Sequence, residues 1–295
     1  MTGIVIASSG GLYTVRTSEG TVQCRARGVF RHKHEKVVVG DRVELAQEGE
    51  STVIDAICTR KNLLIRPPMA NLDYIFVTAA SASPDPDTFM LDKLTTIAEY
   101  NKIKPIVVVG KSELAPERAA ELCDIYAKAG YETFSVSCHT GEGVDAVKRC
   151  IDGLPEGSIS AFAGASGVGK SSLMNLLFPE LSLETSSVSR KTERGRHTTR
   201  SVTLYPSGAG YIADTPGFSM LDFEHFDFFG KDDLPDTFPE FAELLGTCKY
   251  TKCTHTKEDG CSILAAVRSG EIAKSRHDSY LALYEVLKNK HAWDK

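Results

Sequence analysis

FAGASGVGKSSL, residues 162–173, is the stretch that decides the fold of this 295-residue chain. It contains the pattern GxxxxGK(S/T), formed by Gly164, Gly169, Lys170 and Ser171. The pattern stands between an expected strand at residues 160–163 and an expected helix from residue 170. In such a loop, backbone N–H groups cradle phosphates, the lysine neutralises β and γ oxygens, and the hydroxyl ligates Mg²⁺. We therefore expect a nucleoside triphosphate site at the end of a buried strand.

The residues before this loop alternate between apolar runs and helical spacing. YIFVTAA (74–80) and IVVVG (106–110) are continuous apolar runs, typical of parallel strands buried on both faces. TFMLDKLTTIAEYN (88–101) between them has helical spacing, and we expect further helices after Pro116 and from about residue 144. This alternation predicts a doubly wound α/β domain.

The first 65 residues have a different pattern. Five short segments with period-2 alternation are separated by Gly-containing turns, which predicts a small closed barrel of the OB type. Residues 1–66 carry ten Lys/Arg against seven Asp/Glu, and the segment RGVFRHKHEK (27–36) is basic. Such barrels often bind RNA, so we expect either an RNA contact here or a surface that contacts protein alone.

Two motifs after the phosphate loop belong to a switch GTPase. Asp214 and Gly217 form DxxG after an expected strand at residues 210–213, where the aspartate can hold Mg²⁺ through water. Thr198 and Thr199 lie between the phosphate loop and DxxG, and either could close over Mg²⁺ as switch I. The expected magnesium ligands are Ser171, Thr199 and Asp214, although the sequence does not decide between the two threonines.

The guanine-recognition motifs come before the phosphate loop. VVVGKSEL (107–114) ends an expected buried strand and SVSCHTGEG (135–143) ends the next, at the places where a GTPase carries NKxD and an SA-type loop. The motif order therefore predicts a circularly permuted GTPase domain. The expected nucleotide-binding residues are Gly110, Lys111, Ser112, Glu113, Ser137, Cys138, Gly164, Ala165, Ser166, Gly167, Val168, Gly169, Lys170, Ser171, Ser172, Asp214 and Gly217.

A cluster of thiols and one imidazole lies near the C-terminus. Cys248, Cys253, His255 and Cys261 read CxxxxCxHxxxxxC, a Cys₃His set that suits tetrahedral Zn²⁺. Four protein ligands leave no open position, so we expect one structural zinc per chain. His277 is expected at the surface or in packing.

With these motifs in place, the whole chain resembles the family of ribosome small subunit-dependent GTPases (RsgA-type). The resemblance implies an OB barrel (1–66), a permuted GTPase domain (70–222) and a mainly helical zinc-binding domain (223–295). It also implies a GTPase that the small subunit stimulates, that acts late in that subunit's maturation and that leaves after hydrolysis. The matching segments are VGDRVEL (39–45), RPPMANLD (66–73), GASGVGKSSL (164–173), GRHTTR (195–200), DTPGFS (214–219) and GEIAKSRHDSYLALYEVL (270–287).

The sequence departs from the family pattern at the guanine-recognition motif. Where the family usually has NKxD, this chain has Gly110, Lys111, Ser112 and Glu113. Gly110 lacks the Asn side chain that bonds guanine O6 and tethers the loops. We therefore expect weaker guanine discrimination than an NKxD relative shows, by roughly ten- to a hundredfold.

The residue that orients the attacking water is also unusual. The position after Gly217 is Phe218, which cannot orient water as the Gln of Ras-like enzymes does. His197 is our candidate for that role, and the expected catalytic set is His197, Lys170, Thr198 and Thr199. Two alternatives stay open: a nucleotide-dependent RNA-binding module with little hydrolysis or relaxed guanine specificity, and an ATP-using P-loop enzyme.

Composition limits the location and the partners. No run approaches the roughly 18 apolar residues that span a bilayer, and residues 1–20 lack the features of a signal peptide. Five of the eight cysteines are scattered singly, which suits a reducing compartment. We expect a cytoplasmic monomer that contacts GTP or GDP and the small ribosomal subunit with its rRNA, and no membrane.

Overall fold

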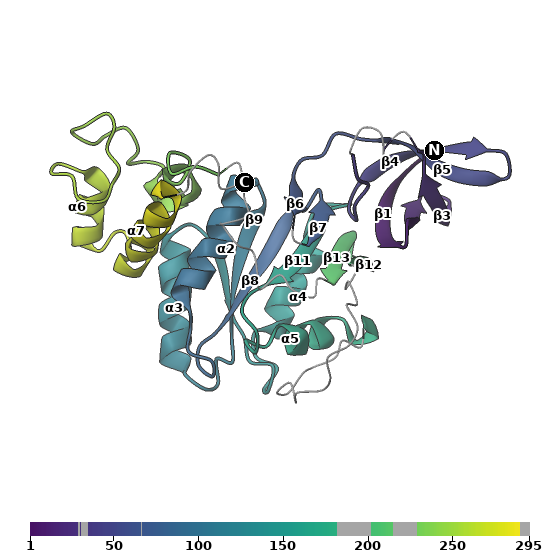
Figure 1. Ribbon diagram of the computed structural model, residues 1–295. Coiled ribbons are helices and arrows are strands. Elements are labelled where there is room, and N and C mark those ends of the chain that lie inside the picture. Colours follow the sequence, from purple (N-terminus) through teal and green to yellow (C-terminus); the bar gives the residue numbers. More distant parts are fainter. Residues whose placement is uncertain (29, 31–34, 66, 182–201, 215–228, 290–295) are drawn as a thin grey trace, which may run out of the picture. The chain divides into compact units, whose positions relative to one another are not determined.

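The computed structural model describes residues 1–28, 30, 35–65, 67–181, 202–214 and 229–289 (Figure 1). The chain divides into two compact units. Unit 1 comprises Met1–Ile75, Arg149–Phe162 and Val188–Met220, and unit 2 comprises Phe76–Lys148, Ala163–Ser187 and Leu221–Lys295.

The described residues between 1 and 57 form a closed five-stranded barrel. The strand order is β1-β2-β3-β5-β4, and β4 pairs back onto β1. All neighbours are antiparallel except β3 and β5. The strands are β1 (Thr2–Ser9), β2 (Leu12–Thr17), β3 (Gly20–Ala26), β4 (Arg42–Glu48) and β5 (Ser51–Ile57). The predicted OB-type barrel is confirmed.

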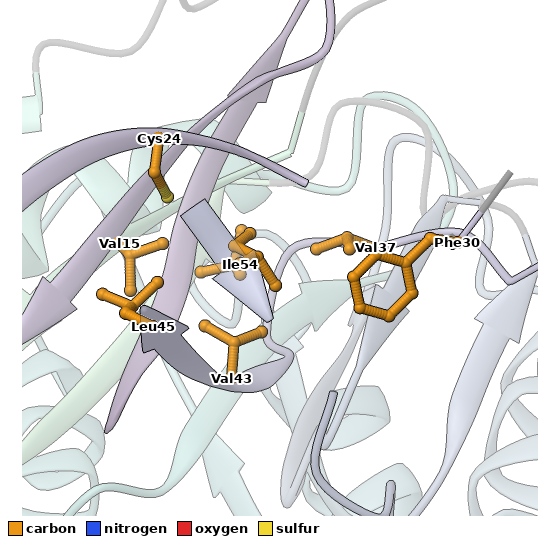
Figure 2. Packing of buried hydrophobic residues seen from close by; sticks show 8 residues of the cluster. Val15, Cys24, Phe30, Val37, Val43, Leu45 and Ile54 are labelled. Carbon is orange, nitrogen blue, oxygen red and sulfur yellow. The ribbon is translucent and has the colours of Figure 1, made fainter. Parts of the chain in front are cut away.

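The barrel core is built from inward-facing residues of these strands, because alternate side chains of a strand point to one face, and from Phe30 and Val37, which lie between β3 and β4. Figure 2 shows the labelled side chains gathered around Ile54. The core residues are Val5, Val15, Cys24, Phe30, Val37, Val43, Leu45 and Ile54.

A buried carboxylate fixes the turn that leads into β4. Asp41 accepts a hydrogen bond from the Val38 N–H at 2.8 Å and pairs with Arg60 Nε at 2.7 Å. The preceding residue, Gly40, has φ +89°, and a Cβ there would lie 2.1 Å from the Ala70 carbonyl oxygen. Only glycine fits this close approach of two backbone segments. Ala70 ends the small hairpin formed by β6 (Leu63–Ile65) and β7 (Pro68–Ala70).

Three further strands, β11, β12 and β13, lie next to the nucleotide motifs in the sequence. β11 (Ile159–Ala163) is parallel to β13 (Gly210–Asp214), and β13 is antiparallel to β12 (Thr203–Ser207). All five residues of β11 are buried. Because β11 and β13 are parallel, their carboxyl ends lie at the same edge of this sheet.

Unit 2 contains strands and helices in the predicted alternation. Strand β9 lies between β10 and β8, and β10 is parallel to β9. The strands are β8 (Tyr74–Ala80), β9 (Lys104–Gly110) and β10 (Glu132–Ser135), and the helices are α2 (Thr88–Tyr100), α3 (Pro116–Lys128), α4 (Val144–Asp152) and α5 (Lys170–Leu177). The first two residues of β8 and the last turn of α4 belong to unit 1. These elements confirm the predicted α/β fold.

The C-terminal part of unit 2 is mainly helical, as predicted. It contains η3 (Pro235–Thr237), η4 (Pro239–Phe241), α6 (Ser262–Ser269) and α7 (Lys274–Lys288). Gly270, with φ +81°, ends α6, because a left-handed residue terminates a helix and glycine adopts that conformation without strain. Helix α7 packs beside α2 (Figure 1).

A buried arginine joins α7 to α2. Arg276 is 1% exposed; its Nη1 donates to Asp92 Oδ1 at 2.6 Å, and its Nε donates to Glu240 Oε1 at 2.7 Å. The guanidinium also lies 4.6 Å from the centre of the Phe238 ring. The cluster holds the C-terminal helix against the α/β part of the unit, since a buried charge of this kind requires its partners.

Within the part of the chain that the structure describes, no helix has the length and apolar character needed to cross a membrane.

Candidate nucleotide site and metal cluster

The phosphate loop follows directly after β11 and needs its glycines. Gly164 has φ +140°, and a Cβ there would lie 2.1 Å from the Thr78 carbonyl oxygen of β8. Gly169, with φ +103°, is the N-cap of α5. The loop therefore passes close to β8 and leads into the N-terminus of α5. Free N–H groups at this helix end favour an anion.

Lys170 is the first residue of α5, and its ammonium group folds back over the loop. Its Nζ donates to the Gly164 carbonyl at 2.8 Å and to the Ala165 carbonyl at 2.6 Å. Burial lowers the pKa of this ammonium group to about 8. A cation in this position lies at the N-terminus of α5, where a helix favours negative charge.

The predicted guanine-recognition loop begins where β9 ends, and it lies against the phosphate loop. A Cβ at Gly110 would lie 3.1 Å from the Val168 carbonyl oxygen and 3.5 Å from that of Ala79. Lys111 adopts φ +57°, and Ser112 N–H donates to the Val136 carbonyl at 3.1 Å. The absence of a side chain at residue 110 thus lets two backbone segments approach closely.

A hydrogen bond links this loop to the predicted SA-type loop. The Ser137 hydroxyl bonds to the Glu113 carboxylate and lowers the pKa of that carboxyl group. Ser137 Oγ also accepts from the Thr140 N–H at 3.1 Å, and Ser137 is fully buried. Glu113 therefore stays ionised at neutral pH, as an acceptor for the N–H groups of a base must be.

The loops surround a cavity of about 400 Å³ inside unit 2. Small-molecule sites in proteins measure about 300–1,000 Å³ and combine apolar walls with a few placed polar groups. Leu114 supplies an apolar wall, and Glu113 supplies the carboxylate. The lining residues are Thr78, Gly110, Lys111, Glu113, Leu114, Val136, Cys138, His139, Val168, Gly169, Ser172 and Leu173.

The cavity brings together residues from all three predicted base and phosphate loops. Four predicted site residues, His197, Thr198, Thr199 and Gly217, lie outside the described residues, and for Asp214 only the backbone is described. The candidate list drawn from the sequence omitted five of the lining residues: Thr78, Leu114, Val136, His139 and Leu173. Leu114 and His139 directly follow residues that were on it, and Thr78 stands near the end of a buried strand, where such sites form.

The predicted Cys₃His set also comes together. One ligand atom from each of Cys248, Cys253, His255 and Cys261 lies within 4.8 Å of all the others. The Sγ atoms of Cys248 and Cys261 are 3.8 Å apart. Tetrahedral zinc with Zn–S bonds of about 2.3 Å requires an S–S separation of roughly 3.8 Å. The donor set and its spacing fit one tetrahedral metal ion.

The surroundings of the cluster support metal-bound sulfur. Backbone N–H groups of Ser262 and Leu264 donate to the sulfurs of Cys248 and Cys261 at 3.4 and 3.5 Å. His277 is buried, and its Nε2 donates to the His255 carbonyl at 2.8 Å, so it packs behind the cluster. Such supporting hydrogen bonds orient metal ligands.

Together, the fold and the site define a circularly permuted P-loop GTPase, in which the base-recognition loops precede the phosphate loop. A protein-family model described as RsgA GTPase matches residues 57–224, and a second, described as RsgA N-terminal domain, matches residues 2–54. The chain belongs to the RsgA GTPase family.

Individual relatives cover almost the whole chain. The small ribosomal subunit biogenesis GTPase RsgA of Bacillus anthracis is 39% identical over 293 residues, which is 98% of each chain. The crystal structure of YjeQ from Thermotoga maritima has a TM-score of 0.82 and 33% identity, and covers 98% of this chain and 99% of its own. The crystal structure of YloQ, a circularly permuted GTPase, has a TM-score of 0.80 and 30% identity, over 98% of this chain and 96% of its own.

Proposed function

We propose that this chain hydrolyses GTP to GDP and phosphate while bound to the small ribosomal subunit, that the subunit stimulates this hydrolysis, and that the protein assists late maturation of the subunit. The observation that carries the proposal is the convergence of three loops on one cavity in unit 2. Membership of the family supports the reaction, and relatives named for small-subunit biogenesis support the partner.

In this proposal the base lies in the cavity and the phosphates lie on the loop at the start of α5. Glu113 accepts hydrogen bonds from the N1 and N2 donors of guanine, and Leu114 packs against the ring. Lys170 neutralises the β and γ oxygens. The expected contacts from Lys111, Ser112, Ser137 and Cys138 and from the loop residues 164–172 belong to the same proposal.

Magnesium is the metal that a GTPase of this kind uses, and it would supply positive charge that neutralises the phosphates. We assign Ser171, Thr199 and Asp214 as its ligands on the motif alone. We assign the orientation of the attacking water to His197, because Phe218 lacks the polar group for that role. If the assignment is correct, His197→Ala abolishes stimulated turnover and leaves GTP binding unchanged, whereas full stimulated turnover in this variant would refute it.

The barrel offers a surface for rRNA. A cavity of about 460 Å³ in unit 1 is lined by the half-buried Tyr13 and by Arg25, Glu35 and Lys36, among others. Arg25 and Lys36 are exposed cations, while Arg27 beside them pairs with Asp55. Cations with neighbouring aromatic rings suit phosphate and base contacts of single-stranded RNA.

Zinc is the metal we assign to the Cys₃His cluster, one per chain and with a structural role. Metal analysis of the purified chain should find about one equivalent of zinc, and Cys253→Ser should reduce it to well below half. Less than half an equivalent in the unaltered protein would contradict the assignment.

The domain organisation is part of the proposal: a barrel at 1–66, a permuted GTPase domain at 70–222 and a zinc-binding domain at 223–295. We also infer a monomer that acts in the cytoplasm, where small subunits mature.

A direct test combines nucleotide competition with sedimentation. Unlabelled GTP should displace labelled GDP from the full chain far better than ATP does. The GTP-bound protein should sediment with purified small subunits and should not sediment with large subunits. Equal displacement by ATP would favour the ATP-using alternative, for which Gly110 is the motivating observation. Stable binding to small subunits without phosphate release would favour a nucleotide-dependent RNA-binding module.

A further inference from the structure

The loop that carries Glu113 needs a tether, since its first residue has no side chain. In an NKxD loop the Asn side chain bonds across to neighbouring loops, and Gly110 cannot do this. The nearest backbone atom, the Val168 carbonyl oxygen, would lie 3.1 Å from a Cβ at residue 110. The position of this loop must therefore be set by groups outside the motif.

Ser81 makes two hydrogen bonds to the backbone of this loop. It lies directly after β8 and is 2% exposed. Its N–H donates to the Gly110 carbonyl at 2.9 Å, and its Oγ donates to the Lys111 carbonyl at 2.7 Å. One residue of the chain thus binds two successive carbonyl groups of the guanine-recognition loop.

The conformation of Lys111 explains why this support matters. Its φ of +57° is left-handed, a region that residues other than Gly, Asn and Asp rarely adopt. The Lys111 carbonyl accepts both from Ser81 Oγ and from the Leu114 N–H at 2.9 Å, and Lys111 Nζ bonds to the Ser83 carbonyl. These contacts stabilise a strained turn, and Glu113 stands two residues further on.

We infer that Ser81 is a positioning residue for guanine recognition: its hydroxyl group fixes the turn at Lys111 and thereby places the Glu113 carboxylate at the base. This inference rests on the proposed function. Because the phosphates are held by a different loop, loss of the tether weakens binding of the guanine base and leaves phosphate binding unchanged.

The test compares two nucleotides that differ in the base. Dissociation constants for GDP and ADP are measured on the full chain by competition against labelled GDP, in wild type and in Ser81→Ala. The control is Ser158→Ala, which makes the same change at a buried serine whose Oγ has no hydrogen-bond partner. Ser81→Cys, a variant of similar volume with a weaker donor, serves if Ser81→Ala does not fold.

We expect Ser81→Ala to weaken GDP binding about tenfold, the effect of one lost hydrogen bond in a buried turn. ADP binding should change by less than about twofold, since adenine lacks the N–H donors that Glu113 accepts. Ser81→Cys should give an intermediate GDP:ADP ratio, and Ser158→Ala the wild-type ratio.

An unchanged GDP:ADP ratio in Ser81→Ala or, where that variant does not fold, in Ser81→Cys would overturn the inference while leaving the proposed function intact. If the ratio is unchanged because GDP and ADP binding weaken equally, the variant has suffered a general loss of structure, and the inference is overturned in the same way. A wild-type protein with no preference for GDP over ADP would overturn both proposals.

Discussion

Lys170 is held at the phosphate loop by two carbonyl groups, and its burial gives it an unusual acid–base property. The pKa of its ammonium group is lowered to about 8, so it begins to lose its proton just above neutral pH. Phosphates beside it favour the charged form and raise this pKa on binding. The bound state therefore takes up a proton that the free state has lost at high pH.

We predict that GDP affinity is nearly constant below pH 7 and falls by up to about tenfold per pH unit above pH 8. The control is Lys170→Arg, which stays charged throughout this range, while the base and the phosphates of GDP titrate identically for both proteins. The dependence is measured from dissociation constants between pH 6.5 and 9.5. The same slope in both proteins would contradict the prediction.

Gly110 and Glu113 set how strictly the site selects guanine. We predict that Gly110→Asn combined with Glu113→Asp raises the GTP:ATP selectivity, by roughly ten- to a hundredfold, through hydrogen bonds that the present motif lacks. Gly110→Ala is the matched control, because it adds only a Cβ, 3.1 Å from the Val168 carbonyl oxygen, and should weaken binding of GTP and ATP alike. Equal GTP:ATP selectivity in the double variant and wild type would contradict the prediction, because Gly110 and Glu113 would then select guanine as strictly as Asn and Asp do.

At the scale of elements, the contact between α2 and α7 depends on Arg276. This arginine is enclosed by Asp92, Glu240 and three aromatic rings. We predict that Arg276→Met lowers the free energy of unfolding by about 3–5 kcal/mol, since two buried carboxylates lose their cation. Denaturant unfolding measures this change.

Two further variants test whether the loss of unfolding free energy comes from the buried charge or from any change to helix α7. Lys274→Ala on the same helix breaks only an exposed pair with Asp278 and should cost less than about 0.5 kcal/mol. Asp92→Asn/Glu240→Gln in the Arg276→Met background should recover part of the loss, because no carboxylate then remains buried. A cost for Arg276→Met below about 1 kcal/mol would contradict this account.

The elements that the sequence predicted best are those with local signals. The strands β8 and β9 are continuous apolar runs, the phosphate loop is a fixed pattern, and the Cys₃His set has metal-ligand spacing. The Arg276–Asp92 pair has no such signal, since 184 residues separate its members. Ser81 was missed for the same reason: its role depends on a loop 30 residues away in sequence.

The whole molecule has the motif order that the sequence predicted, with base recognition before phosphate binding. This order could be predicted because the guanine-recognition motif and the phosphate loop each follow a buried strand, β9 and β11, and permutation leaves strand pairing intact. The residues that line the cavity were harder to predict from the sequence. Thr78, for example, lies about ninety residues before Gly164 in the sequence. In the structure a Cβ at Gly164 would lie 2.1 Å from the Thr78 carbonyl oxygen.

The central claim is that this site hydrolyses GTP in response to the small ribosomal subunit. The most direct measurement is phosphate release from GTP by the full chain, alone and with purified small subunits. We predict slow turnover alone and an increase of at least about tenfold with small subunits, corresponding to a barrier lower by about 1.4 kcal/mol or more. Turnover that is unchanged by small subunits, or equal with ATP and GTP, would contradict the account.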